Sequence, residues 1–450
     1  MSETIKIKQG LDIKLKGKAE KALQVIEPKQ VALQPTDFTG LTPWLLVKEG
    51  DEVKTGTPLF CDKHDERIRF VAPTSGVVTE VRRGEKRLLE AVVIQPNGHH
   101  EALPFELHQD SAEQVKATLL DTGLWPMIRQ RPYSTVACPD DTPKAFFVSA
   151  FDSSPLAPDM DYLAEHHPDS LKKGLEVLSL LSGDKLHLCV HAEKTRSELL
   201  IKAKHVTLHT FCGPHPSGNV GTQINKICPI NKGEIVWVCG LPEVIQIGHL
   251  FLKGELDFSR IYALAGTGLK HPCYVKTILG ASVADLAHDN MEAGHQRLVS
   301  GNVLTGKALD WNGFVSFYDN MVTVIPEGDD RHEFLGWMWP GFRKYSVSRT
   351  FPSGFVPNAL RPEVALDTNT HGEERPFVVT GEFEKVFPFD ILPLSLLKAC
   401  LIGDIDLMEQ LGIYEVAPED FALCEFIDTS KNDLQRIIRE GLELVRKSVC

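Results

Sequence analysis

Residues 41–98 read LTPWLLVKEGDEVKTGTPLFCDKHDERIRFVAPTSGVVTEVRRGEKRLLEAVVIQPNG, and this stretch decides the beginning of the fold. Short runs rich in β-branched and aromatic residues alternate in it with glycine-containing turns, a spacing that is typical of a small all-β unit. The runs are residues 44–47, 57–60, 77–81 and 91–94. Similar turns lie on either side of Gly76, so the stretch divides into two related halves. We expect them to form a flattened sandwich of two sheets.

The pairing of VKEGDEVKTGTPLF with VAPTSGVVTEV resembles the barrel-sandwich fold of biotinyl and lipoyl carrier domains. In carriers a lysine on a hairpin takes the prosthetic group, and Lys63 occupies the comparable place. The hairpin here is longer than in carriers and contains the charged residues 65–67. A swinging carrier arm and an ordinary hairpin with a solvated lysine are the two interpretations. An intact mass with a lipoyl or biotinyl adduct on Lys63 would establish the first.

Composition and length bound the function. The chain has 450 residues, which suggests about three domains. Asp and Glu total 61 against 48 Lys and Arg, so the net charge is −13, and no long basic block is present. This balance argues against nucleic acid as a partner. The 42% hydrophobic content is enough for buried cores.

Membrane and redox signals are sparse. Residues 5–8 alternate like a strand and do not resemble a secretory signal, so we expect a cytoplasmic protein. The most apolar run, residues 389–402, is interrupted by polar residues and is too short to cross the ~30 Å of bilayer hydrocarbon. The ten cysteines form no C-x-x-C pair. We therefore expect reduced, mostly buried thiols and no metal site.

The flanks of the all-β unit carry further signals. Residues 10–17 alternate apolar and polar positions, and residues 31–33 are apolar, so both are expected to be strands of the same unit. Residues 111–121 are expected to form a helix with Ser111 as its N-cap. The run GLWPMIRQRPY at 123–133 is expected to be an irregular loop. Its Trp, Tyr and two Arg suit either a planar or anionic ligand or a packed connection.

From residue 144 onward, strands alternate with helices. Such alternation predicts a largely parallel, Rossmann-like sheet with helices on both faces, whose ligands bind beyond the carboxyl ends of the strands. The expected strands are 145–150, 185–190, 205–210, 234–239 and 260–264, and the expected helices are 160–181 and 242–251.

One loop follows a predicted strand at this edge. Residues 211–223 read FCGPHPSGNVGTQ, and Gly213, Gly218 and Gly221 would allow close backbone approach to an anion. The loop matches neither G-x-G-x-x-G nor G-x-x-x-x-G-K-[ST], and two prolines remove donors. His215 is either a proton partner for a quinone or flavin or a loop histidine bonded to backbone.

The remaining third is mixed. Residues 274–286 predict a strand and a short helix, and residues 297–304 and 314–318 predict further strands of a small α+β module. Residues 337–342, WMWPGF, are either a docking patch or a local core. Apolar spacing predicts helices over 394–411 and 433–449, the second with Ser430 as its N-cap candidate.

These elements give an α/β multidomain chain. The expected order is an N-terminal barrel-sandwich (biotinyl/lipoyl-like) β domain, a Rossmann-like parallel sheet domain, a β-grasp-like (SLBB-type) module and a C-terminal helical domain. Their expected limits are residues 1–104, 105–270, 271–375 and 376–450.

This order resembles the soluble subunits of respiratory NADH:quinone reductases and of the related Rnf complexes. The runs SGVVTEVRRGEKR, GLWPMIRQRPYS, GPHPSGNVGT, HLFLKGEL and KTILGAS together resemble the A-subunit family of Na⁺-translocating NADH:quinone reductases, over essentially the whole chain. That family belongs to membrane complexes that oxidise NADH, reduce ubiquinone to ubiquinol and pump Na⁺ from the cytoplasm to the periplasm.

The resemblance implies a peripheral subunit on the cytoplasmic face of the bacterial inner membrane, without a transmembrane segment. Its implied partners are the other subunits, especially a membrane-embedded flavoprotein, and ubiquinone. FMN, riboflavin and Fe–S centres are expected in those partners, with no cofactor held stably by this chain. The implied part of this chain is the quinone side of the reaction. Our candidates for a quinone pocket are Trp125, Arg129, Arg131, Tyr133, Phe211 and His215.

Departures from the wider superfamily support an accessory role. Where flavin- and NADH-binding relatives carry a GRGGAGFP-like loop, this chain has the bulky residues 123–128, and where Rnf relatives carry cysteine ladders it retains Cys424 alone. It also has no S/T-G-A-T sequence for covalent FMN. A free-standing FMN- and NADH-binding oxidoreductase and a lipoyl or biotin carrier remain the alternatives. Stoichiometric FMN in the purified chain would favour the first of these.

Overall fold

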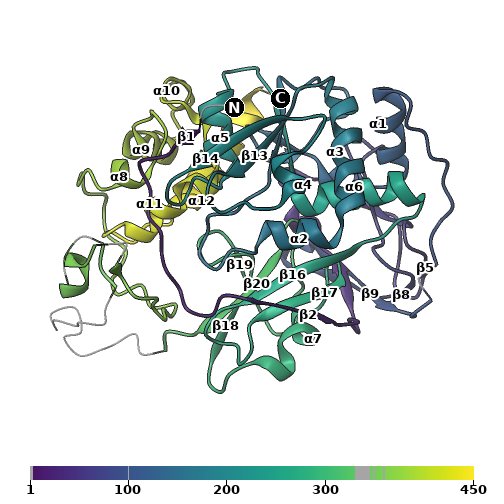
Figure 1. Cartoon of the computed structure of the whole chain (residues 1–450), viewed down its shortest axis with the longest axis horizontal. Helices are drawn as coiled ribbons and strands as arrows, with labels where there is room; N and C mark the ends of the chain where they lie inside the picture. Colours follow the sequence, from purple (N-terminus) through teal and green to yellow (C-terminus); the bar gives the residue numbers. More distant parts are fainter. Residues whose placement is uncertain are drawn as a thin grey trace.

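The computed structural model describes residues 4–99, 101–329, 345–347, 349, 351–357 and 360–449. Within these residues the strands form sheets of seven, six, four and three strands, and the last helices gather at one side of the molecule (Figure 1). The expected α/β multidomain architecture is confirmed. The expected domain limits remain predictions, and residues 337–342 lie outside the described part of the chain.

The N-terminal sandwich consists of the three- and four-stranded sheets, and all four runs predicted from residues 41–98 are strands. The sheet orders are β4-β6-β7 and β3-β9-β8-β5. The bounds are β3 Val31–Leu33, β4 Pro43–Leu45, β5 Glu52–Val53, β6 Pro58–Asp62, β7 Arg69–Val71, β8 Gly76–Arg83 and β9 Leu89–Pro96. Phe60 and Phe70 stack in the core with ring centroids 4.8 Å apart. A Cβ atom at Gly76 would lie 2.1 Å from the carbonyl oxygen of Gln95, so this pairing requires glycine.

The residues before the sandwich connect it to the rest of the chain. Strand β1 (Ile5–Lys6) pairs with β14 in the seven-stranded sheet, and β2 (Glu20–Val25) pairs with β17 in the six-stranded sheet. The prediction of a sandwich strand at residues 10–17 is wrong. That segment makes a single bridge, from Leu15 to Val364, and its alternating apolar side chains are buried without a ladder.

The seven-stranded sheet has the order β1-β14-β13-β12-β15-β10-β11. Its bounds are β10 Arg129–Arg131, β11 Thr135–Val136, β12 Ala145–Ser149, β13 Leu186–His191, β14 Thr207–Cys212 and β15 Val236–Gly240. The strands from β1 to β15 in this order pair in parallel, as predicted, whereas β10 is antiparallel to β15.

Helices cover both faces of this sheet. Phe146 and Val148 share a core with α3 (Pro168–Ser182) and α6 (Leu241–Lys253), which lie side by side in Figure 1. Phe147, from the other face of β12, shares a core with Ile224 of α5 (Val220–Ile227). The shorter helices are α2 (Met160–His166) and α4 (Glu198–Ile201). Helix α1 (Ala112–Asp121) begins as predicted, because Ser111 accepts a hydrogen bond from the N–H of Gln114.

The six-stranded sheet has the order β19-β18-β20-β16-β17-β2. Its other members are β16 Ser259–Ala265, β17 Cys273–Ile278, β18 Gln296–Ser300, β19 Lys307–Leu309 and β20 Met321–Pro326, with α7 Val283–Ala287 beside them. The prediction that residues 260–264 continue the parallel sheet is wrong, because a strand buried on both faces has the same apolar sequence in either sheet. Residues 314–318 are not a strand, and β19 and β20 were missed.

The C-terminal helices are α8 Phe383–Val386, α9 Pro393–Ile402, α10 Ile405–Gln410, α11 Ala422–Ile427 and α12 Leu434–Val449. Gly403, with φ 70°, ends α9 inside the predicted run 394–411. Ser430 is not the N-cap of α12. The N–H of Arg436 donates to Asp433 Oδ1 at 3.0 Å, whereas the Ser430 hydroxyl donates to the carbonyl of Pro376.

Candidate functional site

The segment predicted to be an irregular loop contains a strand at its centre. Residues Trp125–Met127 form a 3-10 turn, and β10 follows it. In the antiparallel register, Arg129 lies opposite Val238 and Arg131 lies opposite Val236. Directly opposed residues share a face, so both arginines extend from the face of the sheet that α5 covers. The prediction failed here because two arginines and a glutamine flanked by prolines have no strand-like pattern.

Two of the six quinone-pocket candidates are core residues. Trp125 is fully buried, its indole N–H donates to the carbonyl of Ala137 at 2.7 Å, and its ring meets that of Trp237 edge-on. Phe211 is fully buried in the core beneath α5. Neither side chain presents surface to a ligand in this conformation.

Two other candidates, the arginines of β10, surround a carboxylate that the sequence did not identify. The buried guanidinium of Arg131 pairs with Glu419 Oε1 at 2.5 Å, while the Glu419 side chain remains 33% exposed. Burial opposes ionisation of Glu419, but the charges of Arg131 and Arg129 outweigh it and hold the pKa of Glu419 below its ordinary value. Glu419 is therefore an anion near both arginines that solvent still reaches.

Arg129 keeps donors available. Its guanidinium lies 4.5 Å from the centre of the Tyr318 ring, a cation–π contact. Within the described residues it has no ion-pair partner, and it is only half-buried. The Tyr318 hydroxyl donates to the carbonyl of Pro126 at 2.7 Å, which fixes the ring beneath the guanidinium. Arg129 thus presents a positioned cation on an aromatic support.

His215 lies in the loop predicted at the carboxyl edge of the sheet. Its Nδ1 lies 3.0 Å from the Ser153 hydroxyl oxygen, and its backbone N–H donates to Asp12 Oδ1 at 2.9 Å. Burial lowers the pKa of His215 to about 4, so the ring is neutral at neutral pH. When protonated, the His215 ring would favour the ionised form of Glu419, as Arg129 and Arg131 do, so three of the six candidates lie near one carboxylate.

The glycines of this loop allow close approach, and it is other parts of the chain that approach them. A Cβ atom at Gly213 would lie 2.2 Å from the carbonyl oxygen of Ile7, and one at Gly218 would lie 2.5 Å from the backbone nitrogen of Ser153. At Gly221 the nearest atom is Asp420 Oδ1, at 2.6 Å. The expected anion cradle therefore contains a carboxyl group of the C-terminal domain.

Asp420 occupies the beginning of α5. Its Oδ2 accepts a hydrogen bond from the N–H of Ala417 at 2.8 Å, and its buried Oδ1 has no hydrogen-bond partner within the described structure. Burial, followed by the negative charge of Glu419, raises the pKa of Asp420 to about 7. A helix N-terminus favours an anion, so α5 offsets part of this cost. The sequence PEDF at 418–421 signals a helix start but no partner, so the sequence could not reveal this contact.

Tyr133 lies at the edge of this group. Its ring meets that of Tyr414 edge-on, 6.5 Å between centroids, and the Tyr414 hydroxyl donates to Glu409 at 2.6 Å. Tyr133 therefore contacts Tyr414 in the C-terminal part of the chain.

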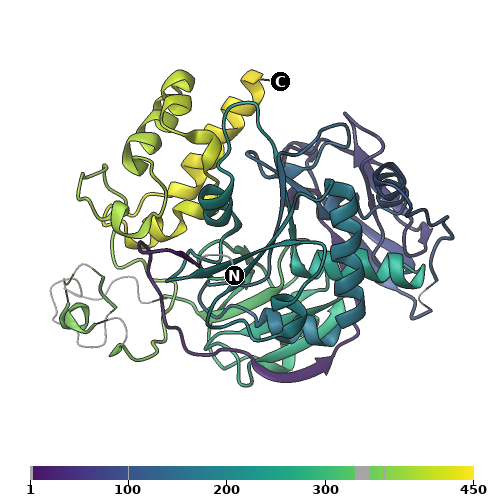
Figure 2. The same cartoon turned by 45° about the horizontal axis from the view of Figure 1, so that its top comes forward.

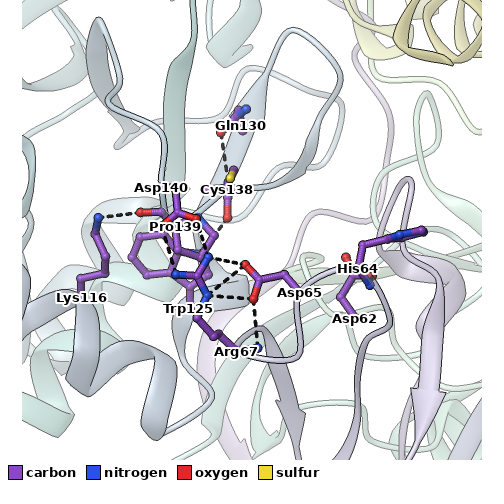
Figure 3. A network of polar contacts seen from close by, with 11 residues as sticks. Asp62, His64, Asp65, Arg67, Lys116, Trp125, Gln130, Cys138, Pro139 and Asp140 are labelled. Carbon is purple, nitrogen blue, oxygen red and sulfur yellow. Dashed lines mark hydrogen bonds and ion pairs between the residues drawn. The ribbon is translucent and has the colours of Figure 1, made fainter. Parts of the chain in front are cut away.

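The lysine hairpin of the sandwich is docked on the seven-stranded sheet domain (Figure 3). Arg67 donates to both oxygens of Asp140, at 3.0 and 2.6 Å, and also to Asp65. Lys116 donates to the carbonyl of Pro139 beside this ion pair. Lys63 is exposed, but the hairpin that carries it is attached to the residue 140 loop through Arg67, unlike the free arm that a carrier requires.

The cysteines form no disulfide bond within the described residues. The nine within the described residues are free thiols, and five of them are buried. In the same part of the chain, no group of three or more His, Cys, Asp or Glu residues is arranged to hold a metal ion. No helix within the described ranges is long and apolar enough to cross a bilayer.

Comparison with family models matches three regions. Residues 5–97 match the NqrA N-terminal barrel-sandwich hybrid domain, residues 110–256 match the NqrA second alpha/beta domain, and residues 261–310 match the NQRA C-terminal domain, an SLBB model.

Curated relatives match the chain over nearly its whole length. The A-subunit of the Na(+)-translocating NADH-quinone reductase of Tolumonas auensis is 39% identical over 97% of this chain and 98% of its own length. The proteins of the same name from Yersinia pseudotuberculosis and Pasteurella multocida are 39% and 38% identical, each over 98% of this chain and 99% of their own. Among solved structures, an air-oxidized NAD+-reducing [NiFe]-hydrogenase aligns at 15% identity with a TM-score of 0.35, over 50% of this chain and 48% of that one.

Proposed function

Because this chain belongs to the NqrA family, the A-subunits of Na(+)-translocating NADH-quinone reductases, we propose that it serves as the NqrA component of such a complex. In this proposal the chain lies on the cytoplasmic face of the bacterial inner membrane and docks on a membrane-embedded flavoprotein. The complex oxidises NADH, reduces ubiquinone to ubiquinol and moves Na⁺ from the cytoplasm to the periplasm. FMN, riboflavin and Fe–S centres belong to the partners, which supply the electrons.

The part proposed for this chain is the quinone-reduction step. The observation that supports it is the half-buried Arg129 guanidinium, which stacks on Tyr318 and has no carboxylate partner within the described residues. A guanidinium donates hydrogen bonds in a fixed plane, and oxygen atoms that gain negative charge are its best acceptors. A quinone carbonyl oxygen gains such charge when electrons arrive and before protons do, so Arg129 would bind this anionic species more strongly than the neutral quinone.

Reduction to a quinol also consumes protons. His215 is a poor source at neutral pH, because its pKa of about 4 leaves it unprotonated. Asp420, with a pKa of about 7, exchanges protons near neutrality and lies beside the ionised Glu419. We assign to Asp420 the proton-exchanging role and to Arg129 the positioning of the quinone oxygen.

The test is the Arg129→Ala variant in the assembled complex, with Arg439→Ala as a control for loss of an exposed arginine of α12. We expect about a tenfold rise in the ubiquinone KM for R129A, the equivalent of one charge-assisted hydrogen bond. NADH oxidation with an artificial acceptor should not change. An unaltered ubiquinone KM in R129A would remove this role.

A further inference from the structure

The outer end of the C-terminal helices exposes a concentration of apolar side chains. Ile402 and Leu401 end α9 with 71% and 55% of their surfaces exposed, and Leu407 of α10 and Leu444 of α12 are also exposed. Leu444 Cδ2 lies 3.6 Å from the Cβ position of Gly403, so the end of α9 and the last turns of α12 meet here. Figure 2 shows these helices at one side of the molecule, with the C-terminus at their outer end.

A groove lies beside this apolar surface. It has a volume of about 490 Å³ and is lined by both ends of the α9–α10 connection, by Ser448 of α12 and by the Lys232–Glu409 ion pair. The lining residues of the connection include Asp404, Ile405 and Asp406. The groove is therefore bounded by three segments that are distant in sequence.

The charge of the groove is negative. Lys232 and Glu409 neutralise each other at 2.7 Å, whereas Asp404 and Asp406 are exposed and have no ion-pair partner within the described part of the chain. Asp404 Oδ1 accepts a hydrogen bond from the N–H of Leu407 and so caps α10, but its charge remains uncompensated. The nearest cations of α12, Arg446 and Lys447, both pair with Glu443.

An apolar surface beside unpaired carboxylates is complementary to a basic amphipathic segment, whose apolar side chains would fill the surface and whose lysines or arginines would meet the carboxylates. Segments that flank membrane spans on the cytoplasmic side have this composition, because Lys and Arg are enriched there. This chain has the opposite charge to such basic segments, since its net charge is −13.

We propose that the acidic groove between α10 and α12, with Ile402 and Leu444 at its rim, is the docking site for a basic amphipathic segment that flanks a membrane span of a partner protein. The proposal rests on the proposed membership of the membrane complex. The partner's apolar side chains bind at the end of α9, and its cations pair with Asp404 and Asp406.

The test uses the full-length chain co-expressed with the other subunits of the complex. The photoreactive residue p-benzoylphenylalanine replaces Ile402, and the crosslinked peptide is identified by mass spectrometry. The control places it at Leu252, an equally apolar exposed position of α6. We expect a crosslink from position 402, absent from position 252, to a Lys- or Arg-rich peptide next to a membrane span. A crosslink to a second copy of this chain, to lipid alone or to nothing in the assembled complex overturns the proposal.

Two variants test the chemistry. Asp404→Asn with Asp406→Asn removes the charges while an asparagine retains the cap of α10, and Ile402→Ser with Leu444→Ser removes the apolar rim. Each should lower co-purification with the complex about tenfold, with the unfolding temperature unchanged.

Glu255→Lys and Leu252→Ser are the matched controls. Failure of the unaltered chain to co-purify would contradict the proposed function, whereas normal assembly of both variants would contradict the docking site alone.

Discussion

The carboxyl oxygen Oδ1 of Asp420 lies 2.6 Å from the position that a Cβ atom would occupy at Gly221. This contact joins the C-terminal helices to the first turn of α5, at the edge of the sheet where related folds bind their ligands. The Asp420 side chain, about 200 residues further along the chain, therefore lies where a ligand of the glycine loop would bind. A substitution at either residue should reveal this contact in the stability of the chain.

Gly221→Ala should destabilise the protein by about 1–3 kcal/mol, because the new methyl group would overlap the Asp420 carboxyl group. Urea unfolding monitored by circular dichroism measures this change. In an Asp420→Gly background the overlap disappears, so the same substitution should cost much less there. An equal cost in both backgrounds would mean that the overlap is not the cause.

Asp420 should make stability depend on pH in a defined direction. Its pKa is raised from 3.8 to about 7 in the folded chain, so the folded state binds more protons than the unfolded state between these values. Stability from this group is therefore greatest below pH 3.8 and decreases as pH rises toward 7. Asp420→Asn should remove this slope, on the order of 4 kcal/mol across the window.

His215 should act in the opposite direction. Its pKa falls from 6.5 to about 4 on folding, so stability decreases as pH falls through this range. The two slopes partly cancel in the unaltered chain, and each becomes measurable in the variant that lacks the other group. Asp420→Asn unfolded at several pH values should gain stability with rising pH up to about 6.5. A flat profile would exclude the assigned histidine shift.

Arg260→Ala should be strongly destabilising. Arg260 of β16 and Glu243 of α6 are almost fully buried, lie 2.9 Å apart and connect the two large sheet domains. Removing one partner leaves a buried charge, at a cost of about 3–5 kcal/mol in unfolding free energy. Lys202→Ala, which removes an exposed ion pair with Glu198, should change stability by less than about 1 kcal/mol. Comparable losses in both variants would refute the role of burial.

Arg67→Ala should loosen the sandwich hairpin without unfolding the chain. The ion pairs with Asp65 and Asp140 are at the surface, so the global cost should stay within about 1 kcal/mol. Trypsin cleavage after Lys63 should become faster, because the hairpin loses its attachment to the residue 140 loop. Asp140→Ala should give the same pattern, and the double variant should add little. Unchanged cleavage in both single variants would show that other contacts hold the hairpin.

Local patterns in the sequence determined most of the elements. The runs of residues 41–98, the Ser111 cap and the βα alternation after residue 144 were correctly predicted, because periodicity and capping act between near neighbours. The same reasoning placed the glycine loop at the carboxyl edge of the sheet. The family to which the chain belongs was identified through motifs that extend along its whole length.

Only the tertiary structure decided where the ends of the chain go and what occupies the glycine loop. Strands β1 and β2 pair with strands more than 200 positions away, and Glu419 and Asp420 return to Arg131 and Gly221. Burial is the physical reason. An apolar strand fits either large sheet equally well, and the partner of a buried charge is set by which surfaces meet, so no local pattern records either choice.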